Sequence, residues 1–239
     1  MLRFKLADLN IEANVIYKIV KRLTGPFQTE FVTPDIVINS SREIIDYEKT
    51  IVEEPLPGTS VYESSAVFRL IAEQLPSFDA MVLHSCSFRV KDKGIAFGAF
   101  SGTGKTTHML LWKEMLGDKF KIINGDKPII RFIDDKLYVF GTPWAGKENL
   151  FENTKAPLTD ICRIERCDTN ITEPMSKDEG VMLLMQQIYM PSDLEARLKT
   201  IELIQRVADS VNFWKIRCNM EPKAAQVSYK AIFGEDLNG

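Results

Sequence analysis

The alternation of hydrophobic and polar residues predicts a β-rich start to the chain. Residues 2–6 alternate in the way a half-buried strand does, and a second short apolar run follows at 36–38. The polar segment 39–43 is expected to be a turn. Apolar positions then recur at helical spacing over 60–75, so the N-terminal region, residues 1–79, is expected to end in an amphipathic helix.

The remainder, residues 80–239, predicts a second region of strands and helices. Residues 80–90 are predicted as one strand, and a tight turn leads from it into the short buried strand 94–98. The spacing over 105–116 then predicts a helix. The later strands are expected at 119–126, 129–133, 136–140, 158–165 and 211–218, with helices beginning at Ser176 and spanning 193–210 and 222–233. Three of these helices have an expected apolar face. It comprises Leu110, Leu111 and Met115 in the helix 105–116, Val181, Leu184, Met185 and Ile188 in the helix that begins at Ser176, and Leu194, Leu198, Ile201 and Ile204 in the helix 193–210.

Composition narrows the function classes. The 239 residues are 45% hydrophobic and 26% charged, with a net charge of −3, which is typical of a globular protein without affinity for nucleic acid. The N-terminus lacks the apolar core of a signal peptide, and no apolar stretch approaches the roughly 20 residues that span a bilayer, so we expect a cytoplasmic protein that does not enter membranes. The four cysteines lack C-x-x-C spacing and are expected to be buried and reduced.

The stretch from Ala99 to Thr106 predicts a phosphate-binding loop. It lies between a predicted strand and a predicted helix and fits G-x-x-x-x-G-K-[ST], except that Ala99 stands at the first glycine position. Backbone N–H groups of such a loop and of the helix N-terminus would point at phosphate oxygens. A glycine-rich turn without a ligand is the alternative. The residues expected to bind the phosphates are Ser101, Gly102, Thr103, Gly104, Lys105, Thr106 and Thr107.

Two further residues are candidates for the chemistry. Asp126 follows a buried strand, where a carboxylate would bind Mg²⁺ together with the Thr106 hydroxyl or accept a proton; the alternative is that 124–128 is merely a turn. His84 lies on the strand that precedes the loop's own strand, so the hairpin would place it near the phosphates. A lone histidine on a strand is also compatible with a purely structural role.

The segment 141–147 is a third candidate. Gly146 and Lys147 would present backbone N–H groups and a cation to a transferred phosphoryl group or to an anionic acceptor. The alternative is a hairpin loop in which Trp144 covers the core. Arg166, at the end of a predicted strand, would steady charge in the same site or lie on the surface.

The runs Phe100-Ser-Gly-Thr-Gly-Lys-Thr-Thr107 and Ile123-Asn-Gly-Asp126 resemble the superfamily of HPr kinase/phosphorylase and ATP-dependent phosphoenolpyruvate carboxykinase. The stretch from Leu83 to Glu165 looks most like the bacterial HPr-kinase-like serine kinases. The resemblance implies an α/β fold: a P-loop core of the phosphoenolpyruvate carboxykinase/HPr kinase type, with a mixed, partly antiparallel sheet, beside the β-rich N-terminal part. It also implies ATP and Mg²⁺ as cofactors, and a histidine at the place of His84 beside the transferred phosphate.

The chain departs from that family in three respects. The paired aspartates of the family's second motif are reduced to Asp126, the lysine-rich acceptor motif of the true HPr kinase is not recognisable, and the chain is too short for a carboxykinase. The resemblance implies a kinase that phosphorylates a hydroxyl group of a protein, a peptide or a small alcohol, with Lys105, Asp126 and His84 as catalytic residues. A nucleotide-binding regulatory module without turnover is the alternative, and a carboxykinase-type enzyme a weaker one. The sequence leaves open a donor other than ATP, such as ADP or pyrophosphate, and a homo-oligomer.

Overall fold

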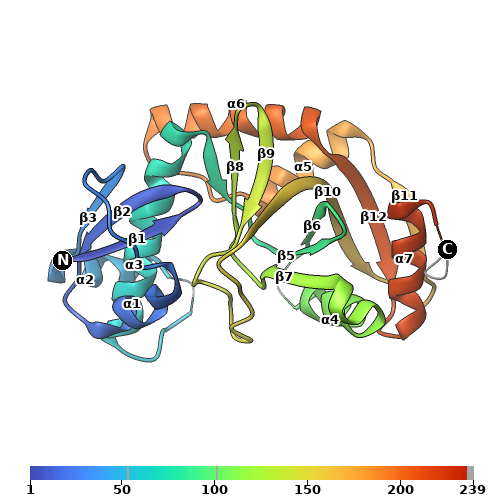
Figure 1. Ribbon diagram of the computed structural model, residues 1–239, viewed down its shortest axis with the longest axis horizontal. Coiled ribbons are helices and arrows are strands. Elements are labelled where there is room, and N and C mark those ends of the chain that lie inside the picture. Colours follow the sequence, from blue (N-terminus) through green and yellow to red (C-terminus); the bar gives the residue numbers. More distant parts are fainter. Residues whose placement is uncertain (53, 101, 236–239) are drawn as a thin grey trace.

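The computed structural model describes residues 1–52, 54–100 and 102–235, which form a mixed α/β fold with a three-stranded and a nine-stranded sheet (Figure 1). The small sheet belongs to the N-terminal region. Its strands are β1 (Leu2–Leu6), β2 (Leu9–Asn14) and β3 (Ile36–Asn39). The strands expected at 2–6 and 36–38 are confirmed, and β2, which the sequence analysis missed, pairs antiparallel with β1 and parallel with β3.

Three α-helices accompany the small sheet: α1 (Lys18–Leu23), α2 (Arg42–Ile51) and α3 (Thr59–Gln74). The turn expected at 39–43 is wrong in its second half, because Ser41 begins a helix there. Its hydroxyl accepts a hydrogen bond from the backbone N–H of Ile44 at 3.3 Å, which satisfies one of the donors left unpaired at a helix N-terminus. Helix α3 is the predicted amphipathic helix.

The large sheet is mixed. Its strand order is β4-β8-β9-β10-β6-β5-β7, and β12 pairs with both β10 and β11. The long strand β10 runs parallel to β6 and β12 and antiparallel to β9, which confirms the expected mixed, partly antiparallel sheet. The strands are β4 (Ala80–Val82), β5 (Ser85–Val90), β6 (Lys93–Gly98), β7 (Phe120–Asn124), β8 (Ile129–Ile133), β9 (Lys136–Phe140), β10 (Lys155–Arg166), β11 (Ile171–Pro174) and β12 (Asn212–Cys218).

The single strand predicted over residues 80–90 is two strands. β4 pairs with β8, whereas β5 pairs with β6 and β7, so the chain leaves one part of the sheet and enters another at Leu83 and His84. There the Leu83 N–H donates to the carbonyl of Pro128 at 3.0 Å, and the His84 N–H to that of Gln187 at 2.8 Å. The break places His84 at the open end of the hairpin β5–β6, directly before the pair Ser85 and Gly98.

Helices cover both faces of the large sheet. α4 (Lys105–Leu116) and α7 (Pro222–Phe233) share a core with β5, β6 and β12, while α5 (Lys177–Gln187) and α6 (Leu194–Ser210) pack on β8, β9 and the opposite face of β10. Short 3₁₀ turns lie at Gly25–Phe27, Leu75–Phe78 and Gly117–Lys119.

The apolar faces predicted for these helices are partly wrong. Helix α4 buries Met109, Trp112 and Leu116, while Leu110 is exposed. In α5, Leu184 and Ile188 are buried as expected, but Met185 is exposed. In α6, Leu194, Leu198 and Ile201 are exposed and the buried face comprises Thr200, Leu203, Ile204, Val207 and Ala208. Each helix has apolar residues on more than one side, so its neighbours decide which side is buried.

The N-terminal region and the large sheet share a continuous core. Phe68 and Ile71 of α3 belong to the same buried cluster as Ile129 of β8 and Phe140 of β9. The division of the chain at residue 79 stays a prediction, since packing continues across it.

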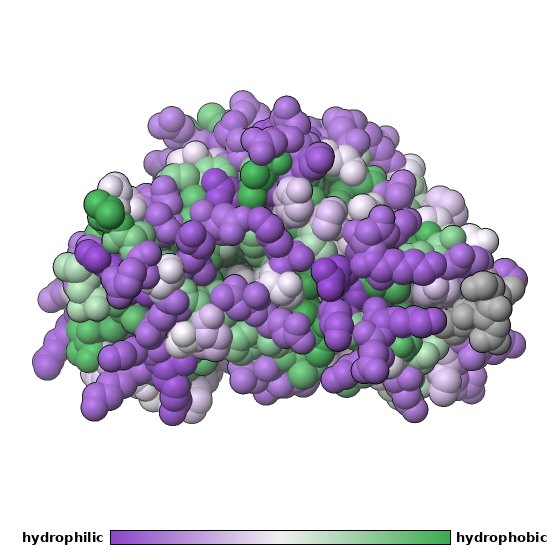
Figure 2. Space-filling view, viewed as in Figure 1, coloured by the Kyte–Doolittle hydropathy of each residue, from purple (hydrophilic) through white to green (hydrophobic). Residues whose placement is uncertain are grey.

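The surface seen in Figure 2 is mostly hydrophilic, with hydrophobic residues in small separate groups. Within the described residues, no helix is long and apolar enough to cross a membrane. The four cysteines are free thiols; Cys86, Cys162 and Cys218 are buried as predicted, and Cys167 is only half-buried.

Candidate active site

The loop between β6 and α4 has the backbone conformation that its glycines predict. Gly102 and Gly104 adopt φ angles of +75° and +117°, which a residue with a Cβ rarely adopts. They turn the chain directly into α4, whose first N–H groups have no partner within the helix. Of the residues predicted to bind phosphate, Ser101 lies outside the described residues. The loop is therefore shaped to present N–H groups at the start of a helix.

Lys105 is the central cation of the site. Its side chain lies largely buried below the loop, and Nζ donates to the carbonyl of Ala99 at 2.8 Å and lies 3.5 Å from Nε2 of His84. Burial lowers the pKa of Lys105, and the negative charge of Asp126 opposes that shift. Lys105 is thus held beside the other two predicted catalytic residues.

His84 and Asp126 form a pair. Nε2 of His84 lies 3.2 Å from Oδ1 of Asp126, and both side chains remain partly open to solvent. Burial alone would raise the pKa of Asp126, but the hydrogen bond from His84 and the nearby charges of Lys127 and Lys105 outweigh it and hold the pKa below its usual value. The structure therefore brings a carboxylate, an imidazole and an ammonium group together at the start of α4.

Hydrogen bonds to Asn124 and Ser85 fix the backbone position of Asp126. The Asn124 side chain accepts from the backbone N–H of Asp126 at 2.8 Å and of Lys127 at 2.7 Å, while its amide nitrogen donates to the carbonyl of Thr142 at 2.9 Å. The Asp126 carbonyl accepts from the N–H of Ser85 at 2.9 Å. The segment after β7 is thus the turn that the alternative interpretation described, and this turn presents the carboxylate to the site.

The loop between β9 and β10 lies directly against Asp126. Gly146 has φ +75°, and a Cβ built on it would come within 3.1 Å of the Asp126 Cβ, so this close approach requires glycine. Lys147 is exposed on the same loop. The backbone N–H of Gly125 donates to the carbonyl of Leu150 at 2.8 Å, which holds the other end of the loop to the same turn.

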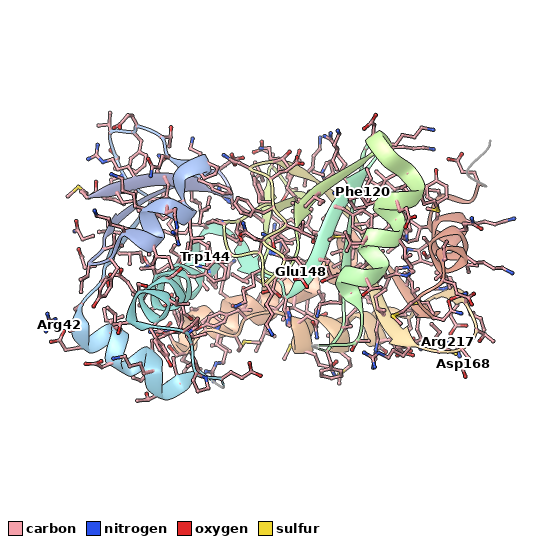
Figure 3. All side chains as sticks on the ribbon, turned by 90° about the horizontal axis from the view of Figure 1, so that it is seen from below. Arg42, Phe120, Trp144, Glu148, Asp168 and Arg217 are labelled. Atoms are coloured by element: carbon pink, nitrogen blue, oxygen red, sulfur yellow. The ribbon has the colours of Figure 1, made fainter. Side chains whose placement is uncertain are left out.

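Trp144 anchors this loop to the N-terminal region. Its ring stacks on Phe68 of α3 with centroids 4.5 Å apart, and its indole nitrogen donates to the Ser64 hydroxyl at 3.0 Å. In Figure 3, Trp144 lies beside the N-terminal helices, and Glu148 lies between them and α4. The alternative given for Trp144, that it packs on the core, is confirmed, and the same contact holds the loop beside Asp126.

Glu148, a second carboxylate, is exposed on the same loop as Gly146. Burial raises the pKa of the Cys86 thiol to about 11, although the hydrogen bond with Thr106 and the charge of Lys105 oppose that shift. The Cys86 sulfur lies 3.6 Å from the Thr106 hydroxyl. Glu148 lies in no recognisable motif, so only the folded loop reveals its place.

Thr107, which follows Thr106 in α4 and is also predicted to bind phosphate, is exposed.

Arg166 supports the loop between β6 and α4 from the other side. Its guanidinium donates to the carbonyl of Thr103 at 3.1 Å and to that of Gly102, so it holds the loop from the end of β10. Gln187 is a second support that the sequence analysis missed. With its amide turned so that nitrogen faces the two carbonyls, it donates to those of His84 at 2.9 Å and Ala99 at 3.2 Å.

Among the described residues, no group of three or more histidine, cysteine, aspartate or glutamate side chains would hold a metal ion. The predicted oxygen donors of the site are the Asp126 carboxylate and the Thr106 hydroxyl. A cation bound by so few protein ligands needs oxygens from a ligand or from water, which is the usual situation of Mg²⁺ in phosphate sites.

Comparison with known proteins finds little. The sequence matches no protein-family model and no curated protein. Among solved structures, the chain is similar to the Hpr(Ser) kinase/phosphatase from Coxiella burnetii, with a TM-score of 0.31 and 8% sequence identity, over 52% of this chain and 87% of that chain. Similarity at this level is too low to assign a fold family or a function.

Proposed function

We propose that this protein is an ATP-dependent kinase that transfers the γ-phosphoryl group to a hydroxyl acceptor. The observation that carries the proposal is the convergence of Lys105, His84 and Asp126 at a glycine-rich loop that opens a helix. Phosphoryl transfer requires positioning and charge neutralisation more than covalent chemistry, and this arrangement supplies both.

The loop would bind the phosphates of the nucleotide. Backbone N–H groups at the start of α4 contact phosphate oxygens, and the Lys105 ammonium moves from the Ala99 carbonyl to the β- and γ-phosphates. Because the ammonium is already beside the loop, little side-chain entropy is lost when it binds the nucleotide.

The donor set fits Mg²⁺ bound to a nucleotide. Asp126 and Thr106 would hold the ion together with phosphate oxygens, and the ion supplies neutralisation of the charge on those oxygens. Asp126 is suited to this role because its lowered pKa keeps the carboxylate ionised at neutral pH.

His84 would take the acceptor proton. When Nε2 carries the hydrogen that binds Asp126, Nδ1 is left with a free lone pair. The acceptor oxygen forms a bond to the γ-phosphorus as the bond to the β–γ bridging oxygen breaks, ADP leaves, and the hydroxyl proton passes to His84. The loop that carries Gly146, Lys147 and Glu148 lies beside Asp126 and is the surface that an acceptor would contact.

The test works without choosing an acceptor in advance. The protein is incubated with ATP and Mg²⁺ and with separate peptide and metabolite pools from a cell extract, and mass spectrometry then identifies molecules that gain one phosphate. A gain that depends on the wild-type chain and disappears with Lys105→Ala supports the proposal. If the wild type binds ATP but phosphorylates nothing in either pool, the regulatory-module alternative is favoured instead.

A further inference from the structure

A cavity lies beside the phosphate loop, on the side of β10. It is bounded by the loop residues Ala99, Phe100 and Thr103, by the end of β10 and by the last turn of α5. In the sheet, β10 flanks β6 on one side, while β5 and β7, which lead to His84 and Asp126, lie on the other. The cavity therefore lies on the β10 side of the loop that follows β6, and Gln187, which also lines the cavity, bonds the backbone of His84.

The lining of the cavity combines buried apolar residues with polar ones. Leu183 is buried on the α5 side of the sheet, while Ala99 and Ile164 border the cavity but belong to the buried cluster on the α4 side. At the rim, Arg163 and Glu165 form an ion pair at 2.9 Å, with about a third of each side chain exposed. Arg166, Gln186 and Gln187 add further polar groups to the lining, and a flat ring with polar edges fits such a mixed lining.

Phe100 is the most unusual residue of the lining. It is 64% exposed although it is a large apolar side chain, and it stands at the edge of the cavity on the phosphate loop itself. An exposed aromatic ring beside a phosphate site is a stacking surface for a heteroaromatic base.

We propose that this cavity binds the nucleobase of the phosphoryl donor, with the base stacked on Phe100. The inference rests on the proposed function, because it takes the phosphates to lie over the start of α4 with their γ end toward His84 and Asp126. The nucleoside then leaves the loop on the opposite side, where the cavity lies. The proposal commits the donor to a nucleotide and excludes pyrophosphate, which has nothing to place in the cavity.

Calorimetric titration with ADP and with pyrophosphate, each with Mg²⁺, tests the inference. The wild type is expected to bind ADP at least about tenfold more tightly than pyrophosphate. Phe100→Ala is expected to weaken ADP binding by about 5- to 150-fold, the range that loss of one stacked base implies, and to leave pyrophosphate binding unchanged. Val32→Ala is the matched control, because Val32 is a 96% exposed apolar side chain of the N-terminal region.

A second measurement does not depend on calorimetry. The fluorescence of 2-aminopurine riboside triphosphate is expected to be quenched by the wild type and by Val32→Ala, but not by Phe100→Ala. If the wild type binds ADP and pyrophosphate equally, or if Phe100→Ala weakens both alike, the inference is overturned while the proposed function stands. If neither ligand binds the wild type, the proposed function is overturned and the inference with it.

Discussion

The ammonium of Lys105 is buried, and it bonds a backbone carbonyl of the loop that it would serve. Lys105→Ala is expected to weaken nucleotide binding by about 10- to 150-fold, since a hydrogen bond to a charged group contributes about 1.5–3 kcal/mol, and to abolish transfer. Calorimetry with ATP and Mg²⁺ measures the first effect. Lys113→Ala, an exposed lysine on the same helix, should bind normally. Wild-type affinity in Lys105→Ala would refute the assignment of the loop.

A second residue of α4 makes the stability of the fold depend on pH. His108 is buried, with Nε2 3.0 Å from the Ser228 hydroxyl and Nδ1 3.6 Å from the Cys218 sulfur, and burial lowers its pKa to about 4. In the unfolded chain the histidine pKa is near 6.5, so between pH 6.5 and 4 the unfolded chain binds a proton at His108 that the folded chain does not bind. The free energy of unfolding is therefore expected to fall by about 3 kcal/mol between pH 6.5 and 4, with no contribution above pH 6.5.

Urea unfolding at several pH values measures this loss. His108→Gln should reduce the dependence of the unfolding free energy on pH in that window. If the free energy of unfolding falls equally steeply with pH in the wild type and in His108→Gln, His108 is not the group responsible.

At the scale of elements, the loop between β9 and β10 is placed by a contact with the N-terminal region. Trp144→Ala removes the stacking on Phe68 and the hydrogen bond to Ser64, so Gly146 loses its fixed position beside Asp126. The transfer rate is expected to fall at least about tenfold, because small misplacements of reacting groups are costly, with nucleotide affinity unchanged.

The rate of phosphoryl transfer and the Kd for ADP are the quantities to compare. Trp214→Ala is the matched control, since Trp214 is also half-buried but bonds Asp160 in the sheet through its indole nitrogen at 2.8 Å. A variant of Trp144 that loses nucleotide affinity and keeps its transfer rate would contradict this role for the loop.

Local patterns in the sequence predict the elements well and their surroundings less well. Helix α4 and the strands β8 and β9 lie where spacing and turn residues predict them, since those signals act over a few residues. The break at His84 is different, because it depends on β4 and β5 joining different parts of the sheet.

The same distinction applies to the candidate site. The phosphate loop and Asp126 follow from short motifs, so their neighbourhood could be predicted. The place of Gln187 could not be predicted, because contacts between distant segments bring it to the site and it lies in no motif. Its place depends on the packing of whole elements.

At the scale of the whole molecule, the N-terminal region and the large sheet are expected to unfold together. Phe68 and Ile71 of α3 share a buried cluster with Ile129 and Phe140 of the large sheet, so neither part keeps its core without the other. Thermal unfolding followed by tryptophan fluorescence and by far-ultraviolet circular dichroism should give one coincident transition. Two separated transitions would instead support two independent domains divided at residue 79.

The fold holds the Asp126 carboxylate and the His84 imidazole together beside the loop that would bind the phosphates. If Asp126 mainly holds Mg²⁺ and His84 mainly takes the proton, the two variants should respond differently to the ion. Asp126→Asn should lower the apparent Mg²⁺ affinity, and added Mg²⁺ should recover part of its rate. His84→Ala should lose about 10²- to 10⁴-fold in rate at every Mg²⁺ concentration, the usual scale for general acid–base catalysis.

The most direct test is therefore a titration with Mg²⁺ of the rate at which label passes from [γ-³³P]ATP to acceptors in a cell extract, for wild type, Asp126→Asn and His84→Ala side by side. We predict a curve shifted to higher Mg²⁺ for Asp126→Asn and a uniformly lowered curve for His84→Ala. Full activity of Asp126→Asn at ordinary Mg²⁺ would contradict the account.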